Sequence, residues 1–179
     1  YSATLRKQDF LDVKKIIKEL KGVSSCIRAL ESCNSMFLSL KKQTGLEEGG
    51  YVVLPASEDL SVRLTDAIRR LDDLLLDHQS FEGRNDVVEL FFDINRFLVI
   101  DSSVDDNYVT YLDCDYGNRI TLTHFCVNPA HSLSTRFDRA RASVLFSATL
   151  LPIRYYRKLL SEVERSEERR VGEEGRSRW

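Results

Sequence analysis

The sequence predicts a mixed α+β fold, in which a helical segment is followed by an incomplete piece of an α/β domain. Helical apolar spacing dominates the chain before residue 105, and two β-rich runs separated by a turn follow it. A short apolar run at 142–146 then ends in small polar residues, which is typical of a strand buried on both faces of a parallel sheet. Since open α/β sheets bind ligands at the carboxyl ends of their strands, Ser147 and Thr149 are candidate site residues.

Four segments before residue 105 have the apolar stripe of an amphipathic helix, which predicts packing of helix on helix. Gly22 is expected to end the first helix, and Ser57 is expected to cap the third. A short extended run separates the second helix from the third. In chain order these segments are Lys7–Leu20, Val23–Leu40, the extended run Tyr51–Leu54, a helix with its apolar stripe at Leu60–Leu75, and about Asn85–Ile100.

Polar residues in this helical part have two interpretations. Arg63, Arg69 and Arg70 lie away from the apolar stripe of the third helix, where they could contact a phosphate backbone or simply face solvent. We favour the solvated face, because most surface arginines have no ligand. His78 is expected to be a surface or capping residue. The acidic cluster Asp101, Asp105 and Asp106 lacks a calcium-loop pattern and is expected to form a solvated connector.

The β-rich runs Tyr108–Cys114 and Arg119–Val127 predict a hairpin. Its turn is expected at Asp115–Asn118, where Gly117 tolerates positive φ. A short helix over His131–Ala140, capped by Ser132, is expected to follow. His124 and His131 are not spaced as metal ligands and are expected to be structural. The residues expected to face the core are Leu112, Ile120, Leu122 and Phe125.

The cysteines do not form a recognisable site. Cys26 and Cys33 lie about 10 Å apart along one helix, too far for a disulfide. The hairpin register is not expected to bring Cys114 opposite Cys126. No C-x-x-C spacing is present, so neither zinc nor an iron–sulfur cluster has its usual ligands here. Reduced, mostly buried thiols in a cytoplasmic protein are therefore expected.

Overall charge and hydropathy narrow the function classes. The net charge of -2 gives no global electrostatic case for nucleic-acid binding. No apolar stretch is long enough to predict a membrane span, and no secretory signal opens the chain. Because the chain begins at Tyr1, we expect a fragment of a longer protein. As a separate expectation, the protein is a monomer. Residues 165–179 are predicted to be a disordered tail, and they resemble the translation of a sequencing-library adapter.

The segment Phe146-Ser147-Ala148-Thr149-Leu150, followed by Pro152 and 155–160 (Tyr-Tyr-Arg-Lys-Leu-Leu), resembles motif III of superfamily-two helicases. It is most similar to the XPD/DinG-like branch, whose members commonly have "FSATLTP..YY..LL" at this position. Those helicases carry a helical Arch domain inserted into the first motor domain between the Walker B box and motif III. The order of elements in this chain fits that arrangement, and 1–5 (Tyr-Ser-Ala-Thr-Leu) is similar to the segment after the Walker B box in bacterial relatives.

The resemblance implies three parts: an Arch-like insert at 1–105, a partial RecA-like motor domain at 106–164, and the tail. It implies a helicase acting on single-stranded or forked DNA, as in DNA repair, with ATP and magnesium bound by the full-length protein. Ser147 and Thr149 would link nucleotide state to translocation, with Ala148 as the small residue between them. An iron–sulfur cluster, if the protein has one, would take its ligands from upstream.

The 179 residues contain no G-x-x-x-x-G-K-[ST] loop and no Asp-Glu-Ala-His sequence. We therefore expect that this chain alone neither binds ATP tightly nor unwinds DNA. The alternative is a non-enzymatic helical protein-interaction module with a small α/β appendage. That alternative predicts a self-contained core, whereas the helicase interpretation predicts an incomplete sheet around 143–146 with an exposed edge.

Overall fold

The computed structural model describes residues 2–55, 58–141, 144, 155–156 and 160. Contacts divide the chain into two compact units, which we call unit 1 (Tyr1–Val127) and unit 2 (Asn128–Trp179). Unit 1 contains a four-stranded antiparallel sheet and four helices, and the described part of unit 2 contains helix α5, Ala130–Phe137. The fold is therefore mixed α+β, as the sequence predicts.

The sheet has the strand order β1-β4-β3-β2, and every neighbouring pair is antiparallel. The extended run and the hairpin were predicted, and both are confirmed. The register pairs Cys114 with Ile120 and Tyr108 with Cys126, so the two hairpin cysteines do not lie opposite each other, as expected. The strands are β1 (Ala3–Arg6), β2 (Gly50–Val53), β3 (Tyr108–Cys114) and β4 (Ile120–Cys126).

Strand β1 was not predicted, and it changes how the hairpin relates to the helices. It pairs with β4 along its whole length, from Ala3 opposite His124 to Arg6 opposite Thr121. The hairpin therefore belongs to the same compact unit as the helices. The sequence-based division between residues 105 and 106 falls inside unit 1, and the contacts separate the two units after the hairpin.

All four predicted helices of unit 1 are present, with ends that differ from the expected ones by a few residues. The first ends before Gly22, and the second continues to Gly45, which has a left-handed φ of 64°. The backbone N–H of Gly45 donates to the Lys42 carbonyl at 3.3 Å, which closes the helix end. The helices are α1 (Lys7–Ile17), α2 (Ser24–Thr44), α3 (Glu58–Asp77) and α4 (Arg84–Asp101).

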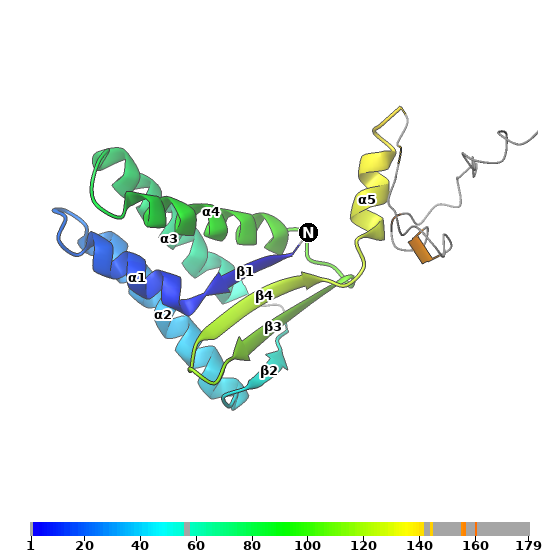
Figure 1. Cartoon of the computed structure of the whole chain (residues 1–179), viewed down its shortest axis with the longest axis horizontal. Coiled ribbons are helices and arrows are strands. Elements are labelled where there is room, and N and C mark those ends of the chain that lie inside the picture. Colours follow the sequence, from blue (N-terminus) through cyan, green and yellow to red (C-terminus); the bar gives the residue numbers. More distant parts are fainter. Residues whose placement is uncertain (1, 56–57, 142–143, 145–154, 157–159, 161–179) are drawn as a thin grey trace, which may run out of the picture. The chain divides into compact units, whose positions relative to one another are not determined.

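The helices form a layer on one face of the sheet (Figure 1). Helices α1 and α4 contact β1 and β4, while α2 and α3 pack against each other and against α1 and α4. Alternate residues of each strand point into this layer, because successive side chains of a strand face opposite sides. The core is continuous through unit 1, and its largest fully buried side chains include Phe10, Phe37, Phe97, Ile17, Leu64, Leu71, Leu112 and Leu122.

One prediction about the hairpin is wrong in detail. Phe125 does not face the core, since its exposed fraction is 48% and its cross-strand partner Val109 lies on the outer side of the sheet. Within the predicted turn, the residue with a left-handed backbone is Asn118, with a φ of 57°. Asparagine tolerates this conformation better than other non-glycine residues, so it can occupy the position.

In unit 2, helix α5 begins at Ala130, and Ser132 is not its cap. The side chain of Asn128 accepts a hydrogen bond from the Ala130 backbone N–H at 3.1 Å. Of the predicted buried strand at 142–146, only Val144 is described; it belongs to no strand and is 83% exposed. A buried strand needs hydrogen-bonded neighbours, and the described residues of unit 2 contain no strand.

Candidate functional site

The residues singled out by the helicase resemblance, Ser147, Ala148 and Thr149, lie outside the described residues. Their role as a coupling motif therefore stays a prediction. Among the polar groups that the structure does describe, the most connected cluster lies where the end of α4 meets the hairpin and α3.

His124 is the centre of this polar cluster. Its Nδ1 atom lies 2.7 Å from the hydroxyl of Thr110, which is its cross-strand partner on β3. Its Nε2 atom lies 3.0 Å from Oδ1 of Asp101 at the end of α4, although off the direction of a good hydrogen bond. The second carboxylate oxygen of Asp101 accepts a hydrogen bond from Ser61 of α3. One network thus joins two helices to both hairpin strands.

The surroundings keep His124 neutral. Its side chain is 2% exposed and stacks on the ring of Phe97, with 4.1 Å between ring centroids. Burial lowers the pKa of His124 below its ordinary value of 6.5, and the nearby Asp101 carboxylate, which acts in the opposite direction, does not cancel this effect. At neutral pH the imidazole is therefore uncharged, and one of its nitrogens accepts while the other donates.

A hydroxyl, an imidazole and a carboxylate in a row are also the groups of a nucleophilic triad. The geometry does not support a catalytic triad here. A catalytic hydroxyl must reach a substrate, and here the central His124 is enclosed by Phe97 and by the sheet. The cluster therefore acts as a structural tie between the helical layer and the hairpin. His124 was expected to be structural, which agrees with this role. Asp101 was expected to lie in a solvated connector, and no sequence pattern indicated its contact with His124.

The buried His124 predicts a pH dependence of stability. A histidine whose pKa is lowered by folding binds a proton more readily in the unfolded chain, so its contribution to stability is present above about pH 6.5 and is lost as the pH falls below that value. As the pH is lowered below about 6.5, we expect the free energy of unfolding to decrease by at most about 1.4 kcal/mol per pH unit. Urea denaturation at several pH values between about 5 and 7.5 measures this slope.

The matched variants are His124→Gln and His78→Gln. The first removes the buried titrating group and should flatten the slope, whatever its effect on absolute stability. The second removes a histidine that is only half-buried, whose Nε2 lies 3.1 Å from the Lys21 carbonyl, and it is the control for the loss of a histidine outside the cluster. A slope that persists in His124→Gln would contradict the assignment.

The cysteines of α2 are not reactive groups. Burial raises the pKa of both Cys26 and Cys33 to about 12. At neutral pH they remain thiols, which are poor nucleophiles and poor metal ligands. All four cysteines are free, and Cys126 is only half-buried. In the part of the chain that the structure describes, no group of three or more His, Cys, Asp or Glu residues could hold a metal ion.

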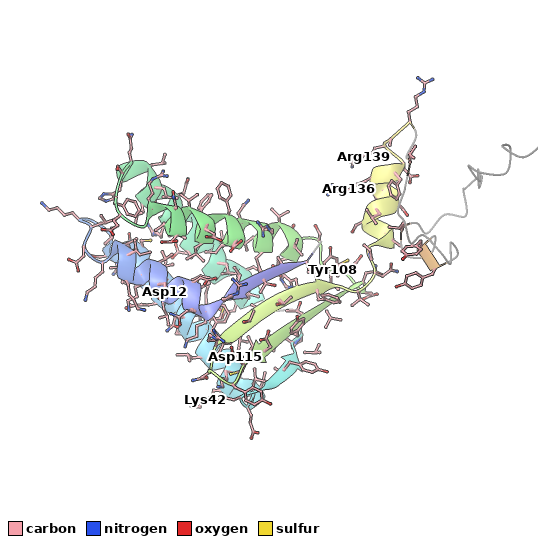
Figure 2. All side chains as sticks on the ribbon, viewed as in Figure 1. Asp12, Lys42, Tyr108, Asp115, Arg136 and Arg139 are labelled. Carbon is pink, nitrogen blue, oxygen red and sulfur yellow. The ribbon has the colours of Figure 1, made fainter. Side chains whose placement is uncertain are left out.

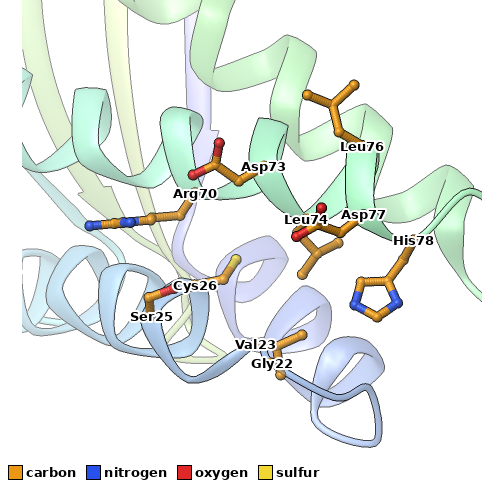
Figure 3. Close-up of a pocket in the computed structure, with 10 residues that line it drawn as sticks. All are labelled: Gly22, Val23, Ser25, Cys26, Arg70, Asp73, Leu74, Leu76, Asp77 and His78. Atoms are coloured by element: carbon orange, nitrogen blue, oxygen red, sulfur yellow. The ribbon is translucent and has the colours of Figure 1, made fainter.

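A pocket of about 280 Å³ lies between the α1–α2 turn and the end of α3 (Figure 3). Its walls include Arg70, Asp73 and Asp77 of α3 beside Cys26 of α2. Ligand sites in proteins are usually larger and mostly apolar, whereas this one presents two carboxylates and a protonated thiol. We assign it no ligand.

The arginines of α3 pair with acidic residues of their own helix. Arg63 lies 2.9 Å from Asp59, and Arg69 and Arg70 lie 2.9 Å and 3.5 Å from Asp66. These distances favour the solvated-face interpretation over a phosphate-binding surface, because each guanidinium group already lies beside a carboxylate of its own helix. None of the described helices is long and apolar enough to cross a membrane.

Comparison with known proteins adds no assignment. No family model matches the chain, and no curated protein matches it either. The XPD/DinG-like relationship expected from 146–160 therefore stays a proposal, carried by those residues and by the geometry of unit 1.

Proposed function

We propose that this chain is part of an ATP-dependent DNA helicase of the XPD/DinG-like branch, with unit 1 as a domain inserted into a motor domain. The observation that carries the proposal is the meeting of the two ends of unit 1. Strand β1 pairs with β4, and the backbone N–H of Cys126 donates to the hydroxyl of Ser2 at 3.1 Å. An inserted domain has to leave and rejoin its host at neighbouring points, and domains with adjacent termini tolerate insertion best.

The order of segments supports the same proposal. The chain leaves β1 into the helices, returns through the hairpin and then reaches the Phe146–Leu150 block. In the family that this block resembles, an inserted Arch domain precedes motif III in the same way. The proposal thus places Ser147 and Thr149 after the insert, where their hydroxyls would couple ATP hydrolysis to movement along DNA.

The described residues do not fit the cofactors that the family uses. They contain no glycine-rich phosphate loop with its lysine, and none of their carboxylates belongs to a metal site. Two of the four cysteines are helical thiols with raised pKa values, which does not suit a cluster ligand. Under the proposal, ATP, magnesium and any iron–sulfur cluster would be bound by other segments of the helicase.

The rival class is a protein-interaction module. Its predicted self-contained core is present, because all buried residues of the core cluster lie before Val127. An inserted domain has its own core as well, so this observation does not separate the two. The rival gives no reason for the block at 146–160, and we therefore prefer the helicase.

A coupling experiment on the intact helicase tests the proposal. The double substitution Ser147→Ala and Thr149→Ala should lower the unwinding rate about tenfold or more while DNA-stimulated ATP hydrolysis stays within about twofold, since the motif links the two processes without cleaving phosphate. Strand-displacement and phosphate-release assays measure both rates. Ser143→Ala, which removes a hydroxyl outside the motif, is the control. Unchanged unwinding, or the absence of ATP hydrolysis in the parent protein, would refute the proposal.

A further inference from the structure

The outer face of the sheet, on the side away from the helices, carries an unusual set of side chains. Tyr51 is 74% exposed and Val53 58% exposed on β2, and Phe125 is 48% exposed on β4. On an antiparallel sheet the solvent-facing side is normally polar. An exposed group of aromatic and aliphatic side chains more often marks an interaction surface. We call this group, together with Val109 and Tyr111 of β3, the outer sheet face.

An acidic side chain lies within this apolar surface. Asp113 is the direct cross-strand partner of Tyr51, and Tyr111 is its neighbour two residues along β3. The rings of Tyr51 and Tyr111 meet edge to face with 6.4 Å between centroids. The Asp113 carboxylate is thus flanked by two tyrosines and is half-buried. Among the described residues, none forms a side-chain hydrogen bond or an ion pair with this carboxylate.

The environment of Asp113 does not favour its charge. Burial, and to a smaller extent the neighbouring Asp115, raises the pKa of Asp113 above its usual value of 3.8. A raised carboxylate pKa means that folding is less favourable once the group is ionised, so at neutral pH Asp113 does not stabilise unit 1. A residue that costs stability at an exposed surface is commonly there for binding.

Two aromatic rings around an unpaired carboxylate are complementary to an organic cation. A guanidinium group can stack on a tyrosine ring and at the same time donate two hydrogen bonds to the carboxylate. Val53 lies opposite Tyr111 on β2, and Val109 lies two residues from Tyr111 along β3, so both extend the apolar surface beside Tyr111. They suit apolar side chains two residues before and after an arginine in an extended segment, because alternate residues of such a segment share a face.

The charges of the outer sheet face disfavour nucleic acid as the partner. Stacked bases need a cation near the rings for the phosphates. The basic residue of this face is Arg6 on β1, at the opposite edge of the sheet from Tyr51 and about 14 Å away. Arg119, in the turn before β4, is already paired at 2.6 Å with Asp115, which lies at the same turn (Figure 2).

We propose that the outer sheet face docks a partner protein through an arginine flanked by apolar side chains, with Asp113 as the counter-ion and Tyr51 and Tyr111 as stacking partners. This inference does not rest on the helicase function. It would hold equally for an inserted domain and for a free-standing interaction module.

The test is a peptide titration of the full chain, followed by the amide chemical shifts of β2 and β3. The probe is the peptide acetyl-Val-Thr-Arg-Thr-Val-amide, whose arginine and two valines share one face when it is extended. The comparator has citrulline in place of arginine, which keeps the shape and removes the charge. Binding of the arginine peptide in the millimolar range is expected, and the citrulline peptide should bind about tenfold more weakly. Asp113→Asn should weaken the arginine peptide to the citrulline level and leave the citrulline peptide unchanged.

The controls decide between specific and unspecific binding. Asp72→Asn removes an exposed carboxylate of α3, away from the sheet, and should change neither affinity. Tyr51→Ala should weaken the arginine peptide, with circular dichroism confirming the fold. Equal binding of the two peptides, or an Asp113→Asn variant that binds both as the parent does, would overturn the proposal. So would an oligothymidylate that binds β2 and β3 more tightly after Asp113→Asn.

Discussion

Replacing Phe97 by alanine is expected to lower the free energy of unfolding by about 4 kcal/mol. The side chain is fully buried in α4, and its ring stacks on His124 of β4. Truncation removes the apolar area of the ring and leaves a cavity next to a polar cluster that relies on close packing. The same change loosens the contact between the helical layer and the hairpin.

The matched control lies on the same helix. Phe92 is 56% exposed, and Phe92→Ala should change stability by no more than about 0.5 kcal/mol. Urea or guanidinium denaturation followed by circular dichroism measures both variants. A loss below about 1 kcal/mol for Phe97→Ala would show that the helices and the sheet do not share one core.

The periodic elements of unit 1 could be predicted from the sequence, because long apolar stripes leave little choice of structure. The stripe of α3 and the alternation around Leu112 and Leu122 both identified the buried side correctly. Phe125 was assigned to the core because it is hydrophobic. It lies three residues after Leu122, so the alternation of the strand places it on the outer side of the sheet. Strand β1 was missed, because it runs directly into α1 with no glycine or proline between them, whereas the equally short β2 is bounded by Gly49 and Pro55.

Long-range pairing could not be predicted in the same way. Nothing in the sequence near Ala3 indicates that its partner is His124, since strand pairing across the chain is decided by tertiary packing. The His124–Asp101 contact was missed for a similar reason: each residue looks ordinary until the end of α4 is placed against β4. The candidate motif at Ser147–Thr149 rests on the sequence, because the structure does not describe it.

The account depends most on the pairing of β1 with β4, which brings the two ends of unit 1 together. The hydroxyls of Thr4 and Thr123 lie 3.2 Å apart across this pair, although the residues are 119 positions apart in the chain. Thr4→Cys with Thr123→Cys should therefore form a disulfide on mild oxidation. Such a long closed loop predicts stabilisation by about 4 kcal/mol relative to the reduced protein, because the crosslink restricts the unfolded chain.

The measurement is made on the folded full chain in a Cys126→Ser background, which removes a nearby half-buried thiol. Mass spectrometry identifies the crosslink, and denaturation with and without reductant gives its contribution to stability. The off-register control is Thr4→Cys with Thr121→Cys, since Thr121 pairs with Arg6 and its diagonal distance is too long for a disulfide. Rapid crosslinking of the in-register pair alone is the predicted result. If that pair stays reduced, or if both pairs crosslink equally, the ends of unit 1 do not meet in this strand pair, and the inserted-domain account is contradicted.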